Sequence, residues 1–141
     1  MITVTRSHEF SAGHRVCGHS GRCKYLHGHN YKVFFEIAHD QDRLDNLGMV
    51  IDFALIKAAL CTWIDSNYDH KMLIWEQDPL LSGLLKVSFD SIVKVPYNPT
   101  AENIAKYLVE VVAPERLKGT NCTLISCTIQ ETEKCQATMR I

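Results

Sequence analysis

Alternating apolar and polar positions near the start of the chain predict two β-strands. Residues 2 to about 10 alternate in this way, and residues 31–39 (YKVFFEIAH) form a second run rich in aromatic and β-branched side chains. Residues 11–30, between the two runs, hold glycines, histidines and cysteines with few apolar anchors. Such a composition indicates a connection between strands that carries function.

Helical spacing of apolar residues predicts two helices in the middle of the chain. Asp52 is placed to cap the first, which runs to about Ser66. The apolar face of this helix is formed by Phe53, Ile56, Leu60, Trp63 and Ile64. The second helix is predicted to begin at Thr100 and to end at Pro114. Its apolar stripe consists of Ile104, Leu108, Val111 and Val112.

Two further strands are predicted near the end of the chain, at residues 121–132 and 135–141, with a polar turn between them. The resulting order ββααββ is typical of an α+β fold with a four-stranded antiparallel sheet and two helices on one face. The length fits one domain, residues 1–141. Residues 75–96 fit a short helix followed by an extended piece, and no element is assigned there.

Composition and charge argue against several classes of function. The formal net charge is -1, and the 15 lysines and arginines are scattered, which argues against nucleic-acid binding. No apolar stretch has the length of a membrane span or the character of a secretion signal, so a cytosolic protein is expected. The six cysteines are therefore expected to be reduced thiols. Cys122 and Cys127, five apart in a predicted strand, should point to opposite faces.

Three histidines predict a metal site. His27 and His29 form an H-x-H pair whose imidazoles project from the same face of an extended segment. His14 lies near the end of the first predicted strand, and a return of the chain would bring it close to the pair. Three neutral imidazoles suit Zn²⁺ and leave a fourth position open for water or substrate. His19 is a competing ligand, and solvated loop histidines are the alternative interpretation.

Cys23 precedes His27 by four residues and is the candidate proton carrier. A nearby cation or imidazole lowers the pKa of a thiol, and the resulting thiolate can accept a proton. The same thiolate could instead be a fourth zinc ligand, which would close the site and make it structural. Cys17 is a second candidate for either role.

Carboxylates supply the remaining candidates. Asp69 and His70 could form a proton relay, although chain neighbours rarely bond each other directly and solvated surface is the alternative. Glu131, at the end of a predicted strand, could accept paired N–H donors from a guanidine-like edge of a heterocycle. Glu102 is explained by its place in the first turn of a helix.

Six short motifs stand in series along the chain: FSAGH (10–14), CKYLHGHNY (23–31), GMVIDF (48–53), DH (69–70), PTAEN (99–103) and ET (131–132). Together they resemble the 6-pyruvoyl-tetrahydropterin synthase family over most of the chain. The resemblance implies a tunnelling fold (T-fold), in which the sheets of two-helix, four-stranded subunits join into a trimeric barrel. Two trimers would stack as a homo-hexamer, with sites between subunits.

The resemblance also implies roles for individual residues. The residues matching the family's zinc ligands are His14, His27 and His29. Cys23 matches the residue that moves protons, and Asp69 and His70 match those that assist it. Glu131 matches the glutamate that anchors the pterin and joins the relay, while Thr100 and Glu102 match residues near the same pocket.

The compact spacing C-x-x-x-H-G-H at residues 23–29 resembles the queuosine-pathway branch of the family. That branch converts 7,8-dihydroneopterin triphosphate to 6-carboxy-5,6,7,8-tetrahydropterin, acetaldehyde and triphosphate. The alternatives are 6-pyruvoyl-tetrahydropterin formation by triphosphate elimination alone, a non-catalytic zinc-binding module, and an unrelated zinc hydrolase. The chain departs from the family at Ile74, where asparagine is frequent, and in a longer insertion before PTAEN.

Overall fold

Two long antiparallel strands lie at the centre of a sheet in the computed structural model, which describes residues 1–141. They are β1 (Thr3–His14) and β2 (His27–His39), and the register pairs His14 with His27. Both strands extend further toward their connection than predicted, because backbone pairing continues through residues that lack the apolar pattern. The predicted connection therefore shortens to residues 15–26.

Four more strands complete the sheet in the order β4-β3-β1-β2-β5-β6. Their bounds are β3 (Lys71–Trp75), β4 (Ile92–Val95), β5 (Cys122–Thr132) and β6 (Cys135–Arg140). The hairpin of β5 and β6 is the predicted one, whereas β3 pairs in parallel with β1, and β4 in parallel with β3. The predicted four-stranded antiparallel sheet in the order ββααββ is therefore incomplete. With 5 and 4 residues, β3 and β4 are too short for alternation to mark them.

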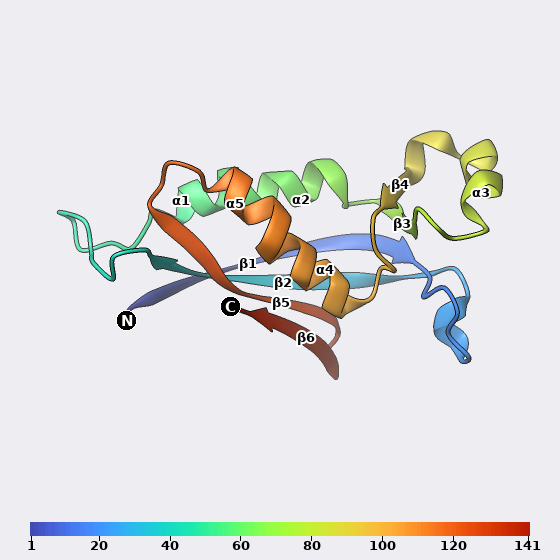
Figure 1. Ribbon diagram of the computed structural model, residues 1–141, viewed down its shortest axis with the longest axis horizontal. Helices are drawn as coiled ribbons and strands as arrows, with labels where there is room; N and C mark the ends of the chain where they lie inside the picture. The colour runs from blue at the N-terminus through green and yellow to red at the C-terminus, as the bar shows by residue number, and fades with distance from the viewer.

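Two long helices cover one face of the sheet (Figure 1). The first consists of α1 (Phe53–Ile56), a π-helical turn (Lys57–Cys61) and α2 (Thr62–Asn67). The second consists of α4 (Ala101–Tyr107), a π-helical turn (Leu108–Val112) and α5 (Ala113–Arg116). The predicted cap of the first helix is confirmed, and the second helix is capped as well: Asp52 accepts a hydrogen bond from the backbone N–H of Ala54 at 2.8 Å. The Thr100 hydroxyl accepts one from Asn103 at 3.1 Å.

The end of the second helix differs from the prediction. Pro114 does not end it, since the helix continues to Arg116. The proline lies in the first turn of α5, directly after the π-helical turn, where the missing N–H costs little. The π-helical turn also changes the angular spacing of side chains. Val111 is consequently 51% exposed, whereas Val112 is buried.

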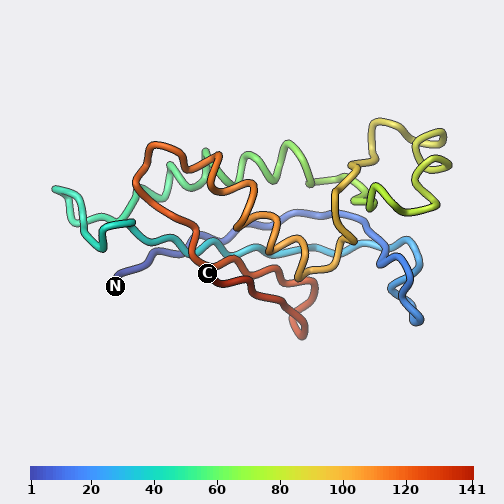
Figure 2. The backbone as a smooth tube through the Cα atoms, in the orientation of Figure 1, coloured from blue at the N-terminus to red at the C-terminus, as the bar shows by residue number.

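The residues left without a predicted element contain a third helix, α3 (Leu81–Val87), followed by a 3₁₀ turn (Phe89–Ser91) and β4. A second 3₁₀ turn, Arg22–Lys24, lies in the β1–β2 connection. Figure 2 shows this connection and the α3 segment at the same end of the molecule, away from the N-terminus. None of the helices combines the length and the apolar character that crossing a membrane requires.

The core fills the space between the sheet and the two long helices, where 28 buried apolar residues form one cluster. Alternate residues of β2 face it, Tyr31, Val33 and Phe35 among them. The prediction that Cys122 and Cys127 point to opposite faces is wrong, because both are buried in this core. A bulge in β5, where the register with β2 shifts, inserts one extra residue between them and restores the common face.

Candidate metal centre

The three predicted ligands meet at the end of the central hairpin, on its helix-covered face. The register places His14 opposite His27 and Ala12 opposite His29, so the third imidazole is the diagonal neighbour of the first. One nitrogen of each ring lies within 4.8 Å of those of the other two. The ring centroids are 4.5 Å apart for His14 and His27 and 5.0 Å apart for His27 and His29. The sequence-predicted trio is therefore brought together.

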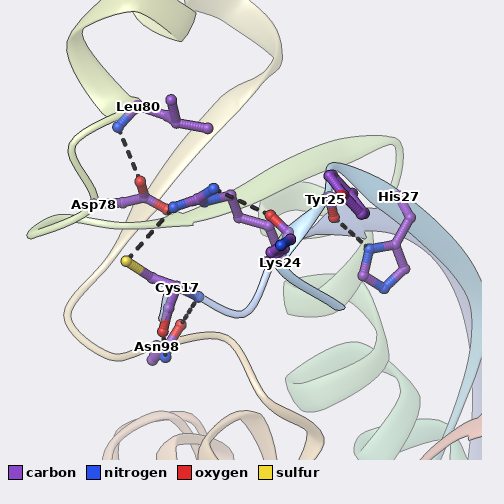
Figure 3. Close-up of polar contacts among 8 residues, drawn as sticks. Cys17, Lys24, Tyr25, His27, Asp78, Leu80 and Asn98 are labelled. Carbon is purple, nitrogen blue, oxygen red and sulfur yellow. Dashed lines mark hydrogen bonds and ion pairs between the residues drawn. The ribbon is translucent and has the colours of Figure 1, made fainter. Parts of the chain in front are cut away.

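Backbone carbonyls orient two of the rings. The Nδ1 atom of His14 lies 2.6 Å from the carbonyl oxygen of Pro99. The Nδ1 atom of His27 lies 2.6 Å from the carbonyl oxygen of Tyr25, a contact drawn in Figure 3. A carbonyl can only accept, so both Nδ1 atoms carry the proton and donate. The Nε2 atoms then keep their lone pairs, which is the arrangement typical of metal-binding histidines.

Two ring nitrogens lack any hydrogen-bond partner. The Nε2 atoms of His14 and His29 are buried and unpaired, which is costly for a polar atom unless a bound group satisfies it. Burial lowers the pKa of His14 to about 4, and burial also lowers the pKa of His29. Both rings are thus neutral at pH 7, as metal ligation requires. The donor set fits a metal ion.

Glu131, at the end of β5, stands beside the same nitrogens. One carboxylate oxygen lies 3.9 Å from His14 Nε2 and the other lies 3.9 Å from His29 Nε2. The sequence indicated a site residue at this strand end but gave no sign that its carboxylate would face the imidazoles. Glu131 can therefore act electrostatically on whatever binds at the histidines.

A cavity of about 290 Å³ adjoins the histidines. It brings together five residues predicted from the sequence: His14, Cys23, Thr100, Glu102 and Glu131. His19, the competing ligand, also lines it, but its Nδ1 accepts a hydrogen bond from the N–H of Gly21. Thr100 and Glu102 belong to the start of the second helix, so the helix cap is also part of the cavity wall.

Cys23 is exposed and sits on the short 3₁₀ turn of the β1–β2 connection. The group of side chains placed to share one metal consists of the three histidines and contains no thiol. This geometry leaves three protein ligands, and so disfavours a closed structural site with Cys23 as the fourth. Cys17, the second thiol considered, contacts the guanidinium of Arg15 at 3.6 Å.

Asp69 and His70 bond each other directly, contrary to the expectation for chain neighbours. His70 has a positive φ of 59°, and its Nδ1 lies 2.9 Å from the Asp69 carboxylate. The other carboxylate oxygen accepts a hydrogen bond from the N–H of Ser11 at 2.9 Å. That bond, together with His70, lowers the pKa of Asp69.

This pair does not share the cavity that Cys23 borders. His70 is 81% exposed and lines a second, open cavity of about 500 Å³ with His29, Asn30 and Met72. Within one chain, the structure therefore separates the predicted relay from the predicted proton carrier.

The chain is similar to known proteins over most of its length. Residues 3–141 match the family model described as 6-pyruvoyl tetrahydropterin synthase. A relative from Rickettsia felis named 6-carboxy-5,6,7,8-tetrahydropterin synthase is 40% identical over 136 residues, 96% of this chain and 97% of its own length. A relative of the same name from Haemophilus influenzae is 31% identical over 112 residues, 77% of this chain and 79% of its own length.

Two solved structures share the fold. An uncharacterized protein from Wolinella succinogenes superimposes with a TM-score of 0.85 at 25% identity, covering 99% of this chain and 97% of that one. The 6-pyruvoyl tetrahydropterin synthase of Caenorhabditis elegans gives a TM-score of 0.66 at 28% identity, covering 99% and 94%. From the match over residues 3–141 and the relatives of nearly equal length, the chain belongs to the 6-pyruvoyl tetrahydropterin synthase family.

Proposed function

We propose that this protein is a lyase that converts 7,8-dihydroneopterin triphosphate to 6-carboxy-5,6,7,8-tetrahydropterin, acetaldehyde and triphosphate. The observation that carries the proposal is the convergence of two unpaired, buried imidazole nitrogens and a third imidazole beside a cavity lined by Cys23 and Glu131. The name shared by the relatives and the compact spacing of residues 23–29 support this reaction. A cytoplasmic location and a place in queuosine biosynthesis follow from the same proposal.

Zinc is the proposed metal, held by His14, His27 and His29. Three neutral nitrogen donors with an open position are typical of catalytic zinc. When bound, zinc supplies Lewis-acid chemistry that acidifies hydroxyl groups of the substrate side chain. The protein's own contribution is to hold the ligands in the correct tautomer through the carbonyls of Pro99 and Tyr25.

Proton transfer is assigned to Cys23, whose thiol borders the cavity. Its exposed position on a turn leaves the sulfur accessible to a bound substrate. Asp69 orients His70, and this pair would exchange a proton at the other face of the substrate. Glu131 is placed to accept paired N–H donors from the pterin, with Thr100 and Glu102 in the cavity wall.

A homo-oligomer with sites between subunits, a hexamer of two stacked trimers, would reconcile the positions of these groups. In one chain, Cys23 and His70 line different cavities. His70 is 81% exposed and thus free to complete the cavity of another subunit. The two edge strands of the sheet, β4 and β6, also remain available for pairing.

The test is incubation of the purified, zinc-loaded protein with dihydroneopterin triphosphate, followed by identification of the products. Release of acetaldehyde together with the 6-carboxy product is the expected result. Formation of 6-pyruvoyl-tetrahydropterin without acetaldehyde would instead favour the activity named for the C. elegans structure. Inertness toward this substrate would contradict both reactions.

A further inference from the structure

Arg15, which directly follows the candidate ligand His14, contacts three groups at once. Its Nε donates a hydrogen bond to Asp78 Oδ2 at 2.6 Å, and its Nη1 donates to the carbonyl of Lys24 at 3.1 Å. Its Nη2 lies 3.6 Å from the sulfur of Cys17. These contacts are drawn in Figure 3. One side chain thus links both ends of the β1–β2 connection to a segment more than sixty residues away.

Asp78 belongs to the insertion that precedes PTAEN, residues 75–96, and it is buried. Its side chain is 1% exposed, whereas the exposed fraction of the Arg15 side chain is 16%. The second carboxylate oxygen accepts a hydrogen bond from the N–H of Leu80 at 2.9 Å, just before α3 begins. A buried carboxylate is strongly disfavoured without a cation. The insertion therefore holds the arginine in one place.

The connection is fastened directly after Cys23, at two successive carbonyls. The carbonyl of Cys23 accepts a hydrogen bond from the N–H of Val16 at 2.7 Å. The next carbonyl, that of Lys24, is the one that Arg15 holds. The peptide groups that follow Cys23 are consequently fixed by two donors from the segment that follows His14. The thiol's position depends on how firmly that segment is anchored.

We propose that Arg15 and Asp78 form a clamp that positions the Cys23 thiol at the cavity, so that the 75–96 insertion takes part in the reaction. The inference rests on the proposed role of Cys23 as proton carrier. Neither clamp residue lines the cavity, so both are positioning residues. Asn98 reinforces the clamp from the far side of the insertion, since its side chain pairs with the N–H and carbonyl of Cys17 at 2.9 and 3.0 Å.

The variant Asp78→Asn tests the clamp with little disturbance. Asparagine keeps an oxygen for the N–H of Leu80 but removes the charge that holds Arg15. We expect kcat to fall about tenfold with KM within about twofold and zinc content unchanged, because small displacements of a reacting group are costly. Amide hydrogen exchange in residues 16–25 should become faster, as local anchoring is lost.

Arg15→Lys tests the same contact from the other side. Lysine keeps the positive charge but cannot reach three groups with a planar fork, so kcat should fall by less than in Asp78→Asn while exchange in residues 16–25 still rises. The matched control is Glu36→Gln, which breaks the ion pair with Arg140 at 3.3 Å on the other face of the sheet. It should change neither kcat nor exchange in the connection.

Wild-type kcat in Asp78→Asn, or unchanged exchange in residues 16–25, would overturn the clamp. Failure of the proposed function would give a different result. If the wild-type protein does not turn over dihydroneopterin triphosphate, the reaction assignment fails. Faster exchange in Asp78→Asn, with Glu36→Gln unchanged, would then still support the clamp as the anchor of the Cys23 segment.

Discussion

Substitution of Cys23 distinguishes a proton carrier from a metal ligand. The thiol borders the cavity but does not belong to the group placed to hold the metal. Cys23→Ala should therefore lose turnover by at least about a hundredfold, as removal of a general acid or base does, while zinc stays near one ion per chain. Product formation and metal analysis by mass spectrometry measure the two quantities. Loss of zinc in the same variant would instead make the thiol a ligand.

For His29, in contrast, we expect substitution to weaken zinc binding. Its Nε2 is buried and has no hydrogen-bond partner, and a bound metal ion would satisfy it. His29→Ala should bind zinc at least about tenfold more weakly, since two protein ligands rarely hold it. Metal content after dialysis gives the answer. His8→Ala, which removes a histidine bonded to Asp65 outside the site, should keep its zinc.

Asp69 gives a prediction on pH. Its folded-state pKa is lowered, first by the N–H of Ser11 and then by His70. A lowered pKa contributes stability above the unfolded pKa, and that contribution is lost as pH falls through the folded value. Asp69→Asn should therefore lower the free energy of unfolding by about 1 kcal/mol at pH 7. The difference from wild type should vanish well below about pH 4, as urea unfolding at the two pH values can measure. A difference that persists at low pH would contradict it.

Features of the site could be predicted where a local sequence pattern determines them, and could not where they depend on an unusual backbone conformation or on strand register. Histidines spaced by two in a strand must share a face, so His27 and His29 could be paired from spacing, whereas His14 required the expected return of the chain. The bond between Asp69 and His70 depends on a positive φ of 59° at a residue that is not glycine, and composition gives no sign of that. The approach of Glu131 to the imidazoles depends on how β5 registers with β2, which no local pattern encodes.

The starts of the two long helices were predicted well because their first residues carry local chemistry. Asp52 accepts a hydrogen bond from the N–H of Ala54, and it lies far along the chain from the three candidate metal ligands. Asp52→Ala should therefore lower the free energy of unfolding by about 1 kcal/mol and leave kcat unchanged. Asp52→Asn, which keeps an acceptor, should lose much less. Chemical denaturation of the three proteins compares them, and equal loss in both variants would argue against the cap.

The parts of the architecture that sequence did not predict owe their structure to distant partners. β3 and β4 are short: β3 becomes a strand because it pairs with the edge of β1 that β2 leaves open, and β4 then pairs with β3. A π-helical turn directly precedes α5, in which the helix continues past Pro114. The periodicity of apolar residues along a short segment predicts neither the short strands nor the π-helical turn.

The assembled protein should show complementation between inactive subunits. If Cys23 and His70 act in one site but come from different chains, Cys23→Ala and His70→Ala are each inactive alone. Subunits mixed at random in equal amounts should recover about one quarter of the wild-type activity, because only pairings with both groups intact can work. Co-expression with two affinity tags, followed by a turnover assay, measures it. No recovery in a confirmed mixed oligomer would place both groups in the same chain's site.

The pairing of His14 with His27 has a consequence for how the metal could be moved or lost. Since two adjacent strands of one hairpin carry all three candidate ligands, binding of a metal ion would depend on the alignment of these strands. A slip of one residue would send one strand's imidazoles to the opposite face, whereas moving all three histidines by two positions along both strands would preserve the triangle. The three histidines could thus be moved along the hairpin only by an even number of residues. A bound ion would favour the correct register of the central hairpin during folding.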